Sequence, residues 1–299
     1  MKKRHLFKVA LATLSLSALA DADAAGAGTS AEEAAKELSN PAGSLASIAN
    51  RLVYTQYKGD LPNADSQDAW SYQFQPVLPF PVGDSGNRII FRPAFGVAFN
   101  QPGYNSGEED FEDIDTSLTD TGFDVVYAGT KMHSKHAGYL WGMGIAGTLP
   151  TATDNDLGGD QWRGGPELFG GVIRSWGLVG GLLSNQWNIG GGDGGPGSND
   201  EDYSTTTMQY FYSITLPDGW QIVTSPIITY DWKSEDSDEA LSLPVGTGIA
   251  KTTELFGLHW RFQTEFIYYV QQPDSFGSDW EVKFTVQPVV ENPFVGWFR

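Results

Sequence analysis

Apolar and polar residues alternate along most of this chain, in runs of 10 to 13 residues from Trp70 onward. In Trp220–Trp232 the even positions carry mostly Trp, Ile, Tyr and Pro side chains, and the odd positions carry mostly polar or smaller ones. Trp280–Val290 repeats the pattern, with Glu281 and Lys283 on its polar side. Because the side chains of a strand point alternately to opposite faces, each run predicts a strand with one face suited to lipid and one suited to water.

Twelve such runs follow one another, and the connections between them are short after even-numbered runs and mostly long after odd-numbered ones. In an outer-membrane barrel, short turns face the periplasm and long loops face outward, so an even number of strands leaves both termini in the periplasm. The sequence therefore predicts an all-β fold, a transmembrane antiparallel up-and-down β-barrel of about 12 strands. The predicted strands are Arg51–Tyr57, Ala69–Val82, Arg88–Phe99, Thr121–Thr130, Gly138–Leu149, Pro166–Ser175, Leu178–Asn188, Thr205–Leu216, Trp220–Trp232, Leu241–Thr252, Gly257–Gln271 and Asp279–Val290.

Acidic residues concentrate in the long connections, at residues 108–120, 200–202 and 235–239. In a soluble sandwich of two sheets, we would not expect acidic residues to concentrate in the connections after odd-numbered runs. The whole chain has a formal net charge of −19. We exclude nucleic acid as a partner at this charge, because binding it depends on the neutralisation of phosphates by Lys and Arg.

The first residues have the composition of a secretory signal. A basic start with Lys2, Lys3 and Arg4 precedes an apolar core at Val9–Ala20 and small residues up to Ala24. We expect residues 1–24 to be a signal peptide that is removed. Export together with the barrel pattern predicts the outer membrane of a Gram-negative bacterium, with the lipid bilayer as a partner. The sequence leaves the oligomeric state open.

Residues 25–50 are expected to form a periplasmic N-terminal segment with one short helix at Ser30–Leu38. Ser30 and Glu33 have the spacing of a capping box, and Asn40 followed by Pro41 ends the helix. Residues 51–290 would then form the barrel and residues 291–299 a C-terminal tail. Whether the helix sits in the lumen as a small stopper is open at this stage.

Charged side chains on the polar faces are the candidates for the lining of the lumen. An Arg at position 92 or 261 would cost roughly 2–4 kcal/mol in the middle of the bilayer, so these residues must face inward. Such charges form either a constriction that selects what passes or a network of ion pairs that fills the lumen, and pairing is the favoured interpretation for Glu281 with Lys283. The inward set also contains small residues such as Gly142 and Gly144, which predict a lumen of uneven width. The charged candidates are Arg88, Arg92, Asp231, Lys251, Arg261, Glu265, Glu281 and Lys283.

Two further patterns are weaker. Asp154, Asp156 and Asp160 alternate in a glycine-containing loop, as ligands of calcium do, but the loop lacks the bidentate Glu, and a solvated loop is favoured over a metal site. A hydrolase would need a Ser–His pair, yet the chain has no Gly-x-Ser-x-Gly motif, and His259 is interpreted as structural. We therefore predict that the protein is not an enzyme and uses neither a metal nor a cofactor.

Several motifs in a specific order resemble the MetA-pathway of phenol degradation family, a group of outer-membrane β-barrel porins. The resemblance spans nearly the whole chain after the signal peptide. It implies a barrel that moves small, often hydrophobic or aromatic, compounds across the outer membrane. The residues that carry it are 40–41, 73–77, 101–102, 147–154, 157–158, 162–166, 216–220, 225–232, 243–251, 268–270 and 273.

Two functions of different classes follow from these observations. The first is a passive outer-membrane channel or transporter for small molecules, including hydrophobic or aromatic ones. The alternative is a structural or receptor-type barrel with a closed lumen, whose acidic outer loops bind cations or external partners. A hydrolase of the outer membrane comes third.

Overall fold

The computed structural model describes residues 30–191 and 203–294. The predicted signal peptide, residues 1–24, lies outside them. Long strands make up most of the described chain, with short helical turns at a few connections. No helix in the described ranges is long and apolar enough to cross a membrane. The elements are α1 (Ala31–Ser39), β1 (Ala46–Lys58), η2 (Ala64–Ser66), β2 (Asp68–Pro81), β3 (Arg88–Phe99), β4 (Gln101–Asn105), β5 (Asp110–Ile114), β6 (Ser117–Leu118), β7 (Thr121–Ser134), β8 (Ala137–Leu149), η3 (Asn155–Leu157), β9 (Gln161–Arg174), β10 (Gly177–Gly191), β11 (Ser204–Thr215), η4 (Pro217–Gly219), β12 (Trp220–Thr224), β13 (Ile227–Asp231), α2 (Ser237–Ala240), β14 (Leu241–Leu255), β15 (Leu258–Gln271) and β16 (Gly277–Val290).

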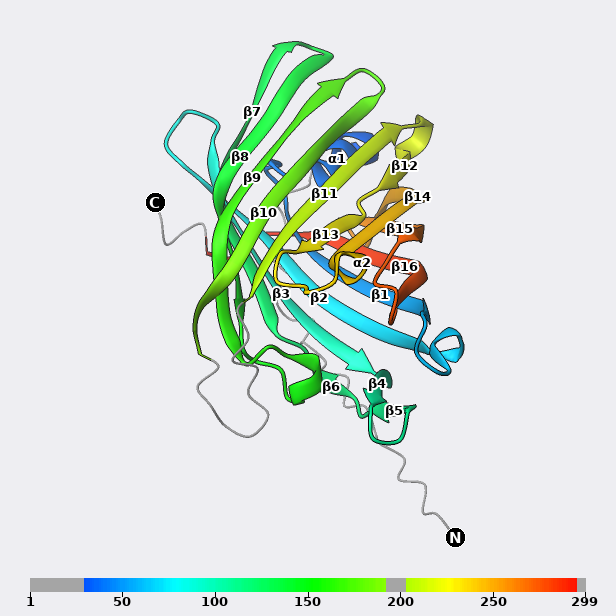
Figure 1. Cartoon of the computed structure of the whole chain (residues 1–299). Coiled ribbons are helices and arrows are strands. Elements are labelled where there is room, and N and C mark those ends of the chain that lie inside the picture. The colour runs from blue at the N-terminus through cyan, green and yellow to red at the C-terminus, as the bar shows by residue number, and fades with distance from the viewer. Residues whose placement is uncertain (1–29, 192–202, 295–299) are drawn as a thin grey trace.

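The strands form one closed antiparallel barrel (Figure 1). Each long strand pairs with the next one along the chain, and β1 pairs with β16 from Ala46 opposite Val290 to Lys58 opposite Gly277. With β12 and β13 counted as one interrupted strand, the barrel has twelve strands, which confirms the predicted fold class. Closure leaves the barrel without an edge, so each of its twelve strands has a partner on both sides.

The ninth strand is interrupted, which the alternation did not predict. Pro226 has no N–H to donate, and the ladder to β14 is unpaired between Val223 and Thr229. Side chains from inside replace the missing backbone partners: the Ser225 N–H donates to Glu265 Oε1 at 2.9 Å, and Gln209 Nε2 donates to the Ser225 carbonyl at 3.1 Å. The break therefore leaves neither the backbone N–H nor the carbonyl of Ser225 without a hydrogen-bond partner.

The connection after β3 contains structure where a plain loop was expected. β4 and β5 pair as a small separate hairpin, and β6 adds two residues beside β3. Aromatic contacts fix the hairpin, since the Phe111 ring lies 5.0 Å from Tyr104 and 4.6 Å from Phe276, measured between centroids. Other differences are extensions, because β1 begins at Ala46 rather than 51 and β9 at Gln161 rather than 166.

The two faces of the wall have different packing. Large apolar side chains such as Met143, Leu168 and Leu183 lie side by side on the outside and are about half exposed. Inside, near the end with the short turns, apolar residues form a buried cluster. The small inward residues serve this cluster rather than widening the lumen there: a Cβ on Gly142 would lie 2.2 Å from the ring of Phe169. The cluster comprises Ala42, Ile90, Val126, Ala128, Leu140, Phe169 and Leu182.

The predicted N-terminal helix is confirmed as α1, Ala31–Ser39. Ser30 and Glu33 form both hydrogen bonds of the capping box. The helix lies within the barrel at the short-turn end, against β12, β14, β15 and η4 (Figure 1). Its buried side faces the wall with Ala34 and Ala35, whose small side chains allow a close approach.

Candidate functional site: a polar cavity inside the barrel

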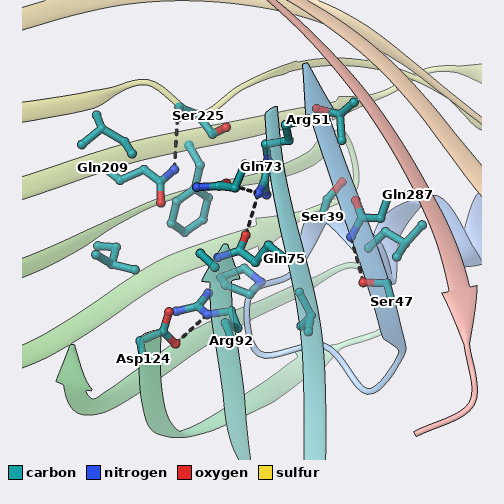
Figure 2. A pocket seen from close by; sticks show the side chains of 18 of the residues that line it. Ser39, Ser47, Arg51, Gln73, Gln75, Arg92, Asp124, Gln209, Ser225 and Gln287 are labelled. Atoms are coloured by element: carbon teal, nitrogen blue, oxygen red, sulfur yellow. Dashed lines mark hydrogen bonds and ion pairs between the residues drawn. The ribbon is translucent and has the colours of Figure 1, made fainter. Parts of the chain in front are cut away.

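The lumen holds a cavity of about 620 Å³ between the N-terminal segment and the inward faces of the strands. Its wall is rich in amide and hydroxyl side chains, which come from strands all around the barrel (Figure 2). Groups of this kind both donate and accept hydrogen bonds and carry no charge. The Gln, Ser and Thr residues on the wall include Ser47, Ser71, Gln73, Gln75, Thr148, Ser184, Gln186, Thr207, Gln209, Ser225, Gln263, Thr285 and Gln287.

Helix α1 is fixed to one side of the lumen by inward side chains. Gln221 Nε2 donates to the carbonyl of Ala35 at 3.2 Å, and Ser39 Oγ donates to Gln221 Oε1 at 3.3 Å. Arg261 reaches the same hydroxyl, with 2.9 Å between the guanidinium nitrogen and Ser39 Oγ. Gln221 and Arg261 are at most 5% exposed, so these bonds lie in the interior.

The chain after α1 crosses to the opposite wall. Asn40 Nδ2 donates to Thr130 Oγ1 on β7 at 3.0 Å, and Arg88 on β3 donates to the carbonyl of Ala42 at 2.6 Å. Ala42 also completes the buried apolar cluster. The N-terminal segment therefore crosses the lumen at its short-turn end, so the helix sits inside the barrel.

Three charged residues form the tightest group on the cavity wall. Arg92 on β3 contacts Asp124 on β7 at 2.7 Å and Glu167 on β9 at 3.0 Å. The side chains are between 5 and 14% exposed, so solvent screens them weakly. Two carboxylates share one guanidinium here, which leaves the group with an excess of negative charge.

Two neighbouring strands, β1 and β16, carry cations without such partners. Arg51 on β1 donates to Gln73 Oε1 and Gln75 Oε1, both at 2.7 Å, as Figure 2 shows. Lys283 on β16 lines the same cavity. Within the described ranges, neither Arg51 nor Lys283 has a carboxylate within 4.0 Å. Arg51 is therefore held by neutral amides.

Four of the eight residues predicted for the lumen line this cavity, namely Arg92, Arg261, Glu265 and Lys283. Arg88 faces inward but holds the N-terminal segment at Ala42.

The predicted pairing of Glu281 with Lys283 is wrong. Glu281 accepts from the Tyr269 hydroxyl at 2.9 Å instead, and residues two apart on a strand are separated by about 7 Å.

The last two candidates, Lys251 and Asp231, do not line the cavity either. Lys251 faces outward, opposite Trp220, and its Nζ lies 5.2 Å from the centroid of that ring while donating to the carbonyl of Asp218. The prediction that it faces the lumen is wrong, because a lysine near the end of a strand can extend its ammonium group out of the lipid. Asp231 ends β13 and accepts from the backbone N–H of Lys233 at 2.9 Å.

Four charged residues of the cavity wall were not predicted, namely Glu37, Arg51, Asp124 and Glu167. Arg51 was placed at the uncertain start of a strand, while Asp124 and Glu167 lie close to the predicted starts of theirs. The alternation places Asp124 on the same face of its strand as Val126 and Ala128. Both of these are buried inside the barrel, so the pattern did indicate that Asp124 faces inward. Only the pairing of strands shows that both acids meet Arg92.

The weak calcium candidate has another arrangement. Asp154 caps the short turn η3 by accepting from the backbone N–H of Asp156 at 3.0 Å, and Asp160 lies at the start of β9 with a φ of 49°. Among the residues that the structure describes, no group of three His, Asp or Glu side chains could hold a metal ion. His259 lies on β15 and is 4% exposed.

Neither the scan against protein-family models nor the search of curated proteins finds a match. The resemblance to the MetA-pathway family therefore stays a prediction. Solved structures do match. An outer-membrane channel from Pseudomonas putida F1 is similar with a TM-score of 0.57 and 12% identity, over 82% of this chain and 96% of that one. The fold is that of an outer-membrane β-barrel.

Two other solved structures are less similar. The outer-membrane phospholipase A from Escherichia coli has a TM-score of 0.41 at 11% identity, over 82% of this chain and 90% of that one. A BenF-like porin from Pseudomonas fluorescens Pf-5 has a TM-score of 0.25 at 8% identity, over 82% of this chain and 97% of that one. The prediction that the chain is not an enzyme is contradicted, since an outer-membrane phospholipase is among the matches.

Proposed function

We propose that this protein is a passive channel for small solutes in the outer membrane. A polar cavity of about 620 Å³ enclosed by a barrel with an apolar outer surface is the observation that carries the proposal. An apolar outside keeps the barrel in lipid, and a polar inside gives water-soluble molecules a place to replace their hydration. The similar channel from Pseudomonas putida F1 supports the same function.

The polarity of the cavity wall limits which solutes can bind there. The family resemblance implies hydrophobic or aromatic compounds, but the cavity wall is polar. Gln73 and Gln75 accept from Arg51 through their Oε1 atoms, and a purely apolar solute would supply no acceptor for their Nε2 groups. Leaving a buried polar group unpaired costs about 1–3 kcal/mol. An aromatic solute would therefore need polar substituents, and the proposal is for small solutes that form hydrogen bonds.

The second candidate, a closed receptor-type barrel, is favoured by the N-terminal segment. Hydrogen bonds to Gln221, Arg261 and Thr130 hold this segment across the short-turn end of the lumen. The alternation of loop lengths predicts that this end faces the periplasm. If the protein is a channel, we expect this segment to move when solutes pass into the periplasm. In the receptor-type barrel it would stay, and the acidic outer loops would carry the function.

A reversible clamp on α1 separates the two candidates. The chain has no Cys, so a Ser39→Cys and Gln221→Cys pair can be joined by a short bis-methanethiosulfonate cross-linker, which spans the gap that the long Gln221 side chain bridges in the wild type and is removed by a reductant. In planar lipid bilayers we expect conductance steps from the wild type and from the reduced pair, and silence from the cross-linked pair. Silence from all three at every voltage would contradict the channel and support the closed barrel.

A further inference from the structure

Charge is sorted across the lumen. Arg51, Lys283 and Arg261 lie on β1, β16 and β15, which are neighbours in the barrel. The acids that share Arg92 lie on β7 and β9. In the order of the barrel, β16 and β9 are separated by five strands on either route and stand opposite each other, whereas β1 and β7 are separated only by β2 and β3. All these side chains line the same cavity.

The cationic side is not neutralised by ion pairs. Arg261 donates to Ser39 Oγ, and its Nε is buried without a hydrogen-bond partner. The one carboxylate on this side, Glu265, lies opposite Lys283 in the register of β15 and β16, and it accepts from the Ser225 N–H at 2.9 Å and from Gln263 Nε2 at 2.7 Å. With Glu265 counted against Arg51, Arg261 and Lys283, this side keeps a formal charge of +2. Within the described ranges, the five ion pairs include none of Arg51, Arg261 and Lys283.

The cavity as a whole shows no preference for one sign of charge. Its lining has four basic and four acidic side chains, the latter including Glu37 of the N-terminal segment. A field that points across the lumen, with no net charge, favours a solute with a positive and a negative end over a simple ion. Such a solute is also neutral overall, so the acidic loops at the other end do not repel it.

We propose that the cavity binds small zwitterions, with the carboxylate of the solute against Arg51 and Lys283 and its cationic group against Asp124 and Glu167. This assignment rests on the proposed channel function and names its class of solute. Arg51 offers a guanidinium that neutral amides hold in place, which suits it to a carboxylate. Glu167 offers a carboxylate that Arg92 only half neutralises.

Binding can be measured without transport, by isothermal titration calorimetry of the full-length protein in detergent. The probes are 4-aminobutyrate and three analogues of similar size, namely butyrate, butylammonium and butyramide. We expect 4-aminobutyrate to bind at least about tenfold more tightly than each analogue, because each analogue lacks at least one of the two charged groups that form charge-assisted hydrogen bonds with the wall. Equal binding of all four probes, or binding of none, would overturn the proposal.

Variants test whether the cationic residues Arg51 and Lys283 and the acidic residue Glu167 are responsible for this binding. The pair Arg51→Gln and Lys283→Gln should remove the preference for 4-aminobutyrate over butylammonium, and Glu167→Gln should weaken the preference over butyrate. Lys251→Gln removes one charge from the outer face and should bind like the wild type. An unchanged preference in the lumen variants, with native heat resistance, would contradict the assignment.

Planar-bilayer recordings keep the two proposals apart. Conductance without selective binding would contradict only the zwitterion site. Selective binding without conductance would contradict only the channel.

Discussion

At the scale of single residues, the group formed by Arg92, Asp124 and Glu167 is the most consequential. Removing one member of a buried charge group leaves the others unpaired, whereas replacing the whole group by neutral side chains is close to neutral. We expect Arg92→Met to destabilise the barrel by about 3–5 kcal/mol, because two carboxylates at most 14% exposed would lose their shared partner.

Urea unfolding in lipid vesicles measures this effect. The triple variant Arg92→Met, Asp124→Asn and Glu167→Gln is the control and should recover most of the lost stability. Equal stability of the single variant and the wild type would mean that the carboxylates do not depend on Arg92.

Two lysines that the alternation treats alike should differ in their effect on ion selectivity. Lys283 lines the cavity and Lys251 faces outward beside Trp220. We expect Lys283→Gln to raise the permeability of cations relative to anions, since one positive charge leaves the wall. Reversal potentials in a salt gradient measure the ratio. A shift of the same size in Lys251→Gln would contradict the outward placement.

At the scale of elements, α1 is the part whose stability decides whether the short-turn end is filled. Its capping box is complete, with the Glu33 N–H donating to Ser30 Oγ at 3.2 Å. An N-cap serine contributes about 0.5–2 kcal/mol to a helix. We expect Ser30→Ala to loosen α1 and to increase the fraction of time that single channels spend open.

The matched control on the same helix is Lys36→Ala. It removes the ion pair to Glu32, in which both side chains are about half exposed and which therefore contributes little. Single-channel recordings at one voltage compare the two variants. Identical open fractions for Ser30→Ala and the wild type would show that the helix does not limit conduction.

At the scale of the whole molecule, the direction of the lipid face is open to a direct test. Leu168 is 55% exposed in the middle of β9, between Met143 and Leu183. In a soluble protein an Arg there would be harmless. In a membrane barrel we expect Leu168→Arg to cost about 2–4 kcal/mol, because the charge enters the hydrocarbon.

Phe256 provides the comparison, since it is 96% exposed in the turn between β14 and β15. Phe256→Arg should cost about 0–1 kcal/mol, as expected near the membrane surface. Unfolding in vesicles measures both variants. Equal stability of the two would contradict a membrane-embedded wall at Leu168.

The sequence by itself determined the strands, their number, the helix α1 and the inward direction of Arg92 and Arg261. These features depend on local rules: the period of two in a strand, the capping box, and the cost of a charge in lipid. The predicted inward direction of Lys251 was wrong because the cost of a charge in lipid does not apply at its position. Lys251 lies near a strand end, where a long side chain can reach water from either face.

Only the tertiary structure decided what the lumen contains. The contact of Glu167 with Arg92 joins residues 75 positions apart, and that of Arg261 with Ser39 joins residues 222 apart. No periodicity encodes such pairs, because they depend on how closure of the barrel brings distant strands face to face. The path of the N-terminal segment across the lumen and the positions of the charged residues around it also depend on this closure. They follow from the order of the strands in the barrel.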